Sequence, residues 1–89
     1  MKIKEGFAKR EIAGSFIVVP VGKTAMEFNA MITLNDSGSF YWDIFQNDIT
    51  IDEAVKLILD EYEVDETRAR ADVEKFVKML KENDLMESN

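Results

Sequence analysis

The spacing of apolar residues changes once along the 89 residues of this chain, at Asn35, and this change constrains the fold more than any other feature. Before Asn35, segments rich in Val, Ile and Phe predict two strands, over 7–12 and 15–21, joined as a hairpin by a two-residue connector. A third strand is predicted over 27–34, where every second residue is apolar. The apolar face of that strand contains Phe28, Ala30, Ile32 and Leu34.

Beyond Asn35, apolar residues three or four positions apart predict three helices. The first spans about 37–45, and Asn35, Asp36 and Ser37 are all good candidates for its cap. We expect this helix to end where Asn47 or Asp48 adopts the left-handed conformation, which these residue types tolerate better than most.

Thr50 and Glu53 have the spacing of a capping box, which predicts a second helix from residue 51 to about residue 62. The last helix is capped by Asp65 or Thr67 and reaches about residue 83. Its buried stripe is predicted from positions at helical spacing: Ala69, Val73, Phe76, Val77 and Leu80. Three strands followed by three helices predict one α+β domain over 1–89, a winged helix-turn-helix-like arrangement with a three-stranded antiparallel sheet.

The chain contains no Cys and no His, and this composition excludes most catalytic chemistry. It removes the thiol nucleophile, the imidazole base and the commonest zinc ligands. Paired carboxylates such as Asp52 and Glu53 occupy adjacent helix positions, whose side chains do not converge on one point. We therefore expect a protein that is not an enzyme and has no catalytic residue, metal site or cofactor. The lack of Cys also suits the cytoplasm.

The charge and the hydropathy of the chain argue against binding to nucleic acid and to membranes. The formal net charge is −7, and residues 31–65 contain nine acidic side chains against Lys56 alone, so this part of the chain would repel phosphate. The longest apolar run, 16–19, ends at Pro20. We expect no signal peptide and no membrane span.

Residues 34–45 resemble the signature of the PqqD-like family, with the sequence Leu-Asn-Asp-Ser-Gly-Ser-Phe-Tyr-Trp-Asp-Ile-Phe. The likeness covers about 7–86, because it continues through the capping box into the second and third helices at Tyr62, Asp72, Val73, Phe76 and Leu80. Members of this family are called RiPP recognition elements, where RiPP denotes a ribosomally made and then modified peptide. The resemblance implies a winged helix-turn-helix that binds the leader segment of a precursor peptide and presents it to a modifying enzyme, often a radical SAM protein.

One segment departs from the founding members of that family. They resemble Tyr-Pro-Glu-Gly before the third strand, whereas this chain has Val19-Pro20-Val21-Gly22. We therefore do not expect a role in making the quinone cofactor itself. The alternative function is a winged-helix DNA-binding transcriptional regulator. The last helix does contain five basic residues, but four acidic residues offset them, and the helix before it is strongly acidic.

The peptide-binding site is predicted along the third strand, because an edge strand accepts an extended peptide through main-chain hydrogen bonds. The predicted contacts on the strand are Ala30, Met31, Ile32 and Thr33, with the backbone of Met31 and Thr33 paired to the peptide. The alternatives are that the amino terminus of the same chain covers this edge, or that the edge pairs with a second copy of the chain to form a homodimer.

The last helix is predicted to form the other side of the binding groove through Arg70, Val73 and Val77, at positions i, i+3 and i+7. Arg70 would meet an acidic group of the leader. Val73 and Val77 also belong to the buried stripe, so a packing role is the competing interpretation for both. Trp42 and the aromatic residues around it are expected in the core, because a domain this small needs them there.

Overall fold

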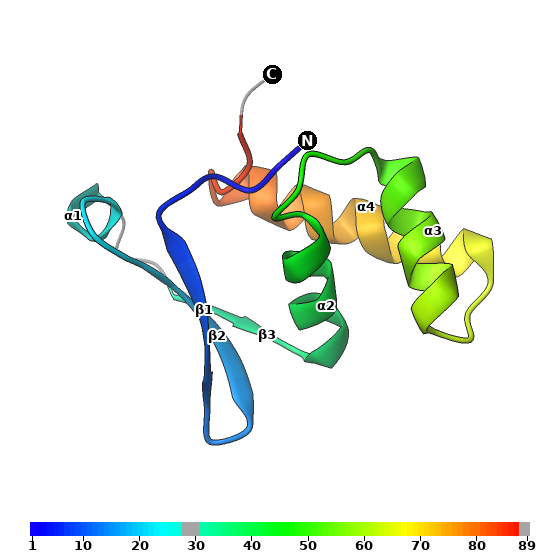
Figure 1. Ribbon diagram of the computed structural model, residues 1–89, viewed down its shortest axis with the longest axis horizontal. Helices are drawn as coiled ribbons and strands as arrows, with labels where there is room; N and C mark the ends of the chain where they lie inside the picture. The colour runs from blue at the N-terminus through cyan, green and yellow to red at the C-terminus, as the bar shows by residue number, and fades with distance from the viewer. Residues whose placement is uncertain (28–30, 88–89) are drawn as a thin grey trace. The chain divides into compact units, whose positions relative to one another are not determined.

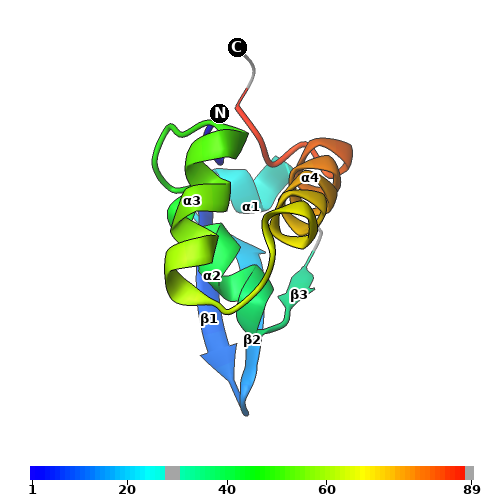
Figure 2. The same cartoon turned by 90° about the vertical axis from the view of Figure 1, so that its right-hand side faces the viewer.

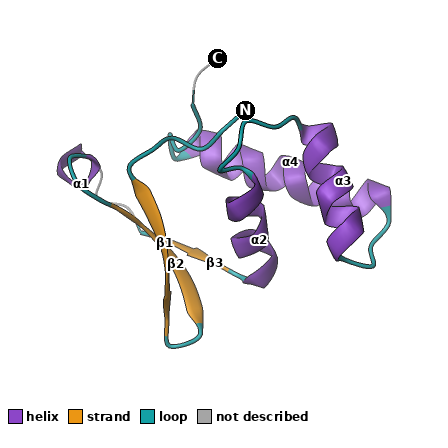
Figure 3. Cartoon of the chain, in the orientation of Figure 1, coloured by secondary structure: helices purple, strands orange, loops and turns teal. Residues whose placement is uncertain are grey.

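The computed structural model describes residues 1–27 and 31–87. Its elements, labelled in Figure 1 and coloured by type in Figure 3, are β1 (Phe7–Ile12), β2 (Ser15–Pro20), α1 (Thr24–Glu27), β3 (Ile32–Leu34), α2 (Asp36–Ile44), α3 (Ile51–Glu61) and α4 (Glu66–Glu82). The predicted α+β class, with a three-stranded antiparallel sheet before the three main helices, is confirmed. No helix within the described ranges is long and apolar enough to cross a membrane.

Contacts between residues divide the chain into two compact units, which are described separately below. The strand unit comprises residues 4–40. The helical unit comprises residues 1–3 together with the chain from Tyr41 onward, so the boundary falls within α2.

The strand unit is built on the predicted hairpin. β2 pairs antiparallel with β1 on one side and with β3 on the other, giving the order β1-β2-β3. Ala13 and Gly14 both have positive φ, 51° and 82°, as the tight turn of a two-residue hairpin requires. This conformation is strained at Ala13 because of its Cβ, and a glycine there would avoid the strain.

The third strand is shorter than predicted, because β3 contains only Ile32–Leu34. Glu27, which was expected at its start, instead ends the short helix α1. The chain turns at Gly22, whose φ is 61°, and the amides of Ala25 and Met26 donate to carbonyls three residues earlier. Ala, Met and Glu are strong helix formers, so this segment closes into a helical turn rather than extending. The predicted strand residues Phe28 and Ala30 lie outside the described residues.

The start of α2 confirms Asn35 as the cap. Its Oδ1 accepts from the amide of Gly38 at 2.7 Å, and its carbonyl accepts from the amide of Ser39. A Cβ at Gly38 would lie 3.0 Å from that same oxygen, which explains why this position is occupied by glycine, which has no side chain. Lys9 of β1 donates to the Ser39 hydroxyl at 2.7 Å and lies over the ring of Phe16. These contacts fix the first turn of α2 to the sheet within the strand unit.

The predicted left-handed ending of this helix is wrong. Among the described residues other than glycine, positive φ occurs at Ala13 and Asp84, and not at Asn47 or Asp48. The amides of Gln46 and Asn47 instead donate to carbonyls three residues earlier. The helix therefore ends by tightening its last turn, which satisfies the carbonyls without a left-handed residue.

In the helical unit, the predicted caps of α3 and α4 are both confirmed. Thr50 and Glu53 make the two reciprocal hydrogen bonds of a capping box, and Asp65 accepts from the amide of Arg68 at 2.8 Å. α3 and α4 pack against each other (Figure 2). All five residues of the predicted α4 stripe are buried: Ala69, Val73, Phe76, Val77 and Leu80.

An aromatic group completes the core of the helical unit. Tyr41 meets Phe76 edge-on at 5.5 Å between ring centroids, and Phe45 stacks on Phe76 at 6.3 Å. Trp42 is 3% exposed, which confirms its predicted place in the core. Packing of this kind contributes about 0.5–1.5 kcal/mol per aromatic pair beyond the area that it buries.

The two ends of the chain are joined in the same unit. Ile3 and Met86 form an antiparallel bridge, and the amide of Glu87 donates to the carbonyl of Lys2 at 2.8 Å. Ile3 is buried, and its amide donates to the carbonyl of Phe45. We call residues 1–3 and 85–87 the terminal clasp.

Candidate functional site

β3 is one of the two edge strands of the sheet. It pairs with β2 through Phe16 opposite Leu34, Ile17 opposite Thr33 and Val18 opposite Ile32. Within the described part of the chain, no strand pairs with its other side. Leu34 is buried, whereas Thr33 is exposed. β3 therefore combines an anchored side chain with a backbone edge that is open in the sheet.

The other edge strand, β1, is chemically different. It is six residues long and contains three consecutive charged residues, Lys9, Arg10 and Glu11. Charged side chains on an edge strand oppose pairing with another chain, because a new strand would have to approach and desolvate them. β3 contains no charged residue. Of the two edges, β3 is therefore the more receptive to an added strand.

The predicted strand contacts are placed differently along the chain. Ile32 and Thr33 lie in β3, and Met31 directly precedes it with 70% of its surface exposed. Ala30 lies outside the described residues. All of these positions belong to the strand unit, whereas Arg70, Val73 and Val77 belong to α4 in the helical unit.

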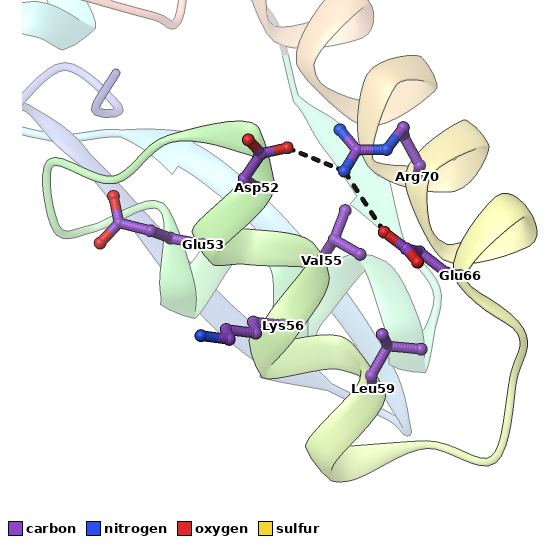
Figure 4. Close-up of a pocket in the computed structure, with 7 residues that line it drawn as sticks. All are labelled: Asp52, Glu53, Val55, Lys56, Leu59, Glu66 and Arg70. Carbon is purple, nitrogen blue, oxygen red and sulfur yellow. Dashed lines mark ion pairs between the residues drawn. The ribbon is translucent and has the colours of Figure 1, made fainter.

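Arg70 is already engaged by acidic residues of the helical unit. Its Nη2 lies 2.8 Å from Oδ1 of Asp52 on α3 and 3.7 Å from Oε1 of Glu66 on its own helix. Dashed lines in Figure 4 mark both ion pairs. The hydrogen bond with Asp52 raises the pKa of Arg70 further above its usual value. The guanidinium therefore links α3 to α4, and an acidic ligand would have to compete with two carboxylates for it.

Val73 and Val77 are buried in the same helix. Val73 is 0% exposed, so its side chain packs in the core and offers no surface to a ligand in this conformation. Val77 is 4% exposed but borders a cavity of about 330 Å³. The other residues that line this cavity are Ile51, Glu74, Lys78, Lys81 and Glu82.

A second cavity, of about 460 Å³, lies between α3 and α4 and was not anticipated from the sequence (Figure 4). Its apolar lining residues are Val55 and Leu59, and its other lining residues are charged: Asp52, Glu53, Lys56, Glu66 and Arg70. Little in the sequence indicates this cavity. Leu59 has the helical spacing of the buried residues of α3, so it is expected in the core, and yet 37% of its surface is exposed. Within the described residues, no group of three or more His, Cys, Asp or Glu side chains is placed to hold a metal ion.

Two solved structures share this fold. One is described as TbiB1 in complex with the TbiA(beta) leader peptide; it has 22% sequence identity and a TM-score of 0.76, and the match covers 100% of this chain and 98% of that one. The other is described as lasso peptide synthetase B1 complexed with the leader peptide; it has 17% identity and a TM-score of 0.75, with 98% and 96% covered.

Sequence comparison gives a complementary result. No curated protein sequence matches the chain. The family model described as coenzyme PQQ synthesis protein D (PqqD) matches residues 16–86, which is most of the sequence and includes the signature at 34–45. The resemblance read from that signature is thereby confirmed, and the chain belongs to the PqqD family.

Proposed function

We propose that this protein is a RiPP recognition element: a non-catalytic module that binds the leader segment of a ribosomally made precursor peptide. The observation that carries the proposal is the uncharged strand β3 at an edge of the sheet, in a member of the PqqD family. The two structures of similar fold, each described as a complex with a leader peptide, support the same class of ligand.

The proposed binding mode is addition of the leader as a fourth strand beside β3. Main-chain groups on the outer side of β3 would pair with the peptide backbone and fix its register. The proposed strand contacts are Ala30, Met31, Ile32 and Thr33. Because main-chain pairing is nearly independent of sequence, the side chains beside the edge must supply the selectivity.

The helical unit contributes separate candidates to this proposal. Val77 borders a cavity and Arg70 borders another, so both are proposed as secondary contacts for the peptide. Val73 has no exposed surface, so we assign it to the packing of α4 in the core and not to the peptide contacts.

The remaining parts of the proposal concern partners. We infer that a separate enzyme, of the radical SAM class or another peptide-modifying class, acts on the bound precursor in the cytoplasm. A second copy of the chain would need the same open edge of β3 to form a homodimer, so peptide and self-association should compete. DNA binding is disfavoured, because the helical unit contains 14 acidic and 7 basic side chains.

Amide chemical-shift mapping tests this function directly. The probes are synthetic copies of the amino-terminal segments of short peptides encoded near the gene, added one at a time to the ¹⁵N-labelled full chain. Peptide addition to the edge should concentrate the shifts at residues 31–34 and on the paired residues 16–18 of β2. Shifts confined to α3 or to the 46–50 loop, with β3 silent, would contradict strand addition.

A further inference from the structure

Met31 is an exposed apolar residue at the end of the proposed binding edge. It directly precedes β3, and 70% of its surface is accessible although its side chain is apolar apart from a weakly polar thioether. Among the described residues of the strand unit, three other large apolar side chains are exposed, and none is in β3 or next to it in sequence: Ile12, Val21 and Met26. The following inference rests on the function proposed above.

The length of β3 determines beyond which end of this strand a bound peptide must extend. β3 has three residues, whereas strands in proteins usually have about five or six. At the Leu34 end the backbone turns into α2 at once, and both the side chain and the carbonyl of Asn35 are used by the first turn of that helix. A bound strand of ordinary length therefore extends beyond β3 at the other end, past Met31.

We propose that the Met31 side chain determines specificity by covering a large apolar side chain of the peptide. Methionine suits this role, because its unbranched, polarisable side chain adapts to ligands of different shape. Thr33 is polar, uncharged and exposed, and places no comparable apolar surface beside the edge. The peptide should therefore have Leu, Ile, Phe or Met at the position beside Met31, with the position beside Thr33 less restricted.

A displayed library of random 12-residue peptides, selected on the immobilised full chain, tests the proposal without knowledge of the natural leader. The selected peptides should share a large apolar residue at one aligned position. Met31→Gln should weaken the best peptide about tenfold, because burial of an apolar side chain of this size is lost. Met31→Leu should stay within about twofold of the wild type, since volume and apolarity are kept.

Ile12→Gln provides the matched control. Ile12 is 56% exposed and lies beside the hairpin turn on β1, so the change removes an exposed apolar group from the opposite edge strand, with β2 between it and β3. Its affinity for the selected peptide should equal that of the wild type. Equal losses in Ile12→Gln and Met31→Gln would overturn the specific role of Met31.

Methyl-¹³C labelling of methionine gives a second readout that does not depend on mutation. The Met31 methyl signal should shift when the selected peptide is added, whereas that of Met86, which is 6% exposed in the helical unit, should stay unchanged. A shift at Met26 with Met31 silent overturns the proposal. If the wild type enriches no peptide, the proposed function itself fails. If it does, and Met31→Gln binds equally well, only the role of Met31 fails.

Discussion

Trp42 shows how much one side chain can matter in a domain of this size. It is almost fully buried, and the small hydrophobic core of so short a chain supplies only about 3–5 kcal/mol of net stability. Trp42→Ala should cost about 3–5 kcal/mol and leave the chain largely unfolded at room temperature. Thermal unfolding followed by circular dichroism measures this, with Leu57→Ala on the exposed side of α3 as the control. A cooperative transition with an unchanged midpoint in the Trp42 variant would contradict its place in the core.

At the scale of elements, Thr33→Pro tests the direction in which the β3 backbone donates. If the Thr33 amide faces the peptide, proline removes one main-chain donor from the binding edge and leaves the pairing with β2 intact. Peptide binding should be lost while the melting temperature changes little, and Thr33→Val, which keeps the amide, should still bind. A large fall in melting temperature would mean that the Thr33 amide pairs with β2, and that Ile32 and Leu34 donate to the peptide instead.

The ion pair between α3 and α4 should add little to stability. The Asp52 side chain is 82% exposed, and exposed pairs contribute about 0.2–1 kcal/mol. A double-mutant cycle of Asp52→Asn and Arg70→Gln, measured by urea unfolding, should give a coupling free energy within that range that falls as salt is added. A coupling well above it, unchanged by salt, would show that the pair is shielded from solvent.

These elements also show which features a sequence can predict. The capping box and the Asp65 cap depend on residues three positions apart, so local spacing was sufficient to find them. The period-two alternation of residues 27–34 predicts too long a third strand, because the turn at Gly22 and the helix formers after it favour a helical turn instead. The contact between Arg70 and Asp52 joins two helices through their packing, and no pattern in either helix specifies it.

At the scale of the whole molecule, the charge is divided unevenly. The strand unit contains four acidic and four basic side chains, so the entire net charge of −7 belongs to the helical unit. We expect negligible affinity for duplex DNA at physiological salt, because non-specific binding depends on attraction to phosphate. Fluorescence anisotropy of a labelled duplex, measured at low and at physiological salt, tests this. Micromolar binding with a steep salt dependence would instead support the regulator.

The terminal clasp has a consequence for how this protein can be combined with others. Because Ile3 and Met86 are bridge partners, a chain that enters the domain leaves it only about 5 Å away. Residues 3–86 can therefore be inserted into a surface loop of a host protein almost without separating the ends of that loop. We expect a peptide-modifying enzyme that receives them in this way to retain its own melting transition, and to gain a tethered binding site at high effective concentration.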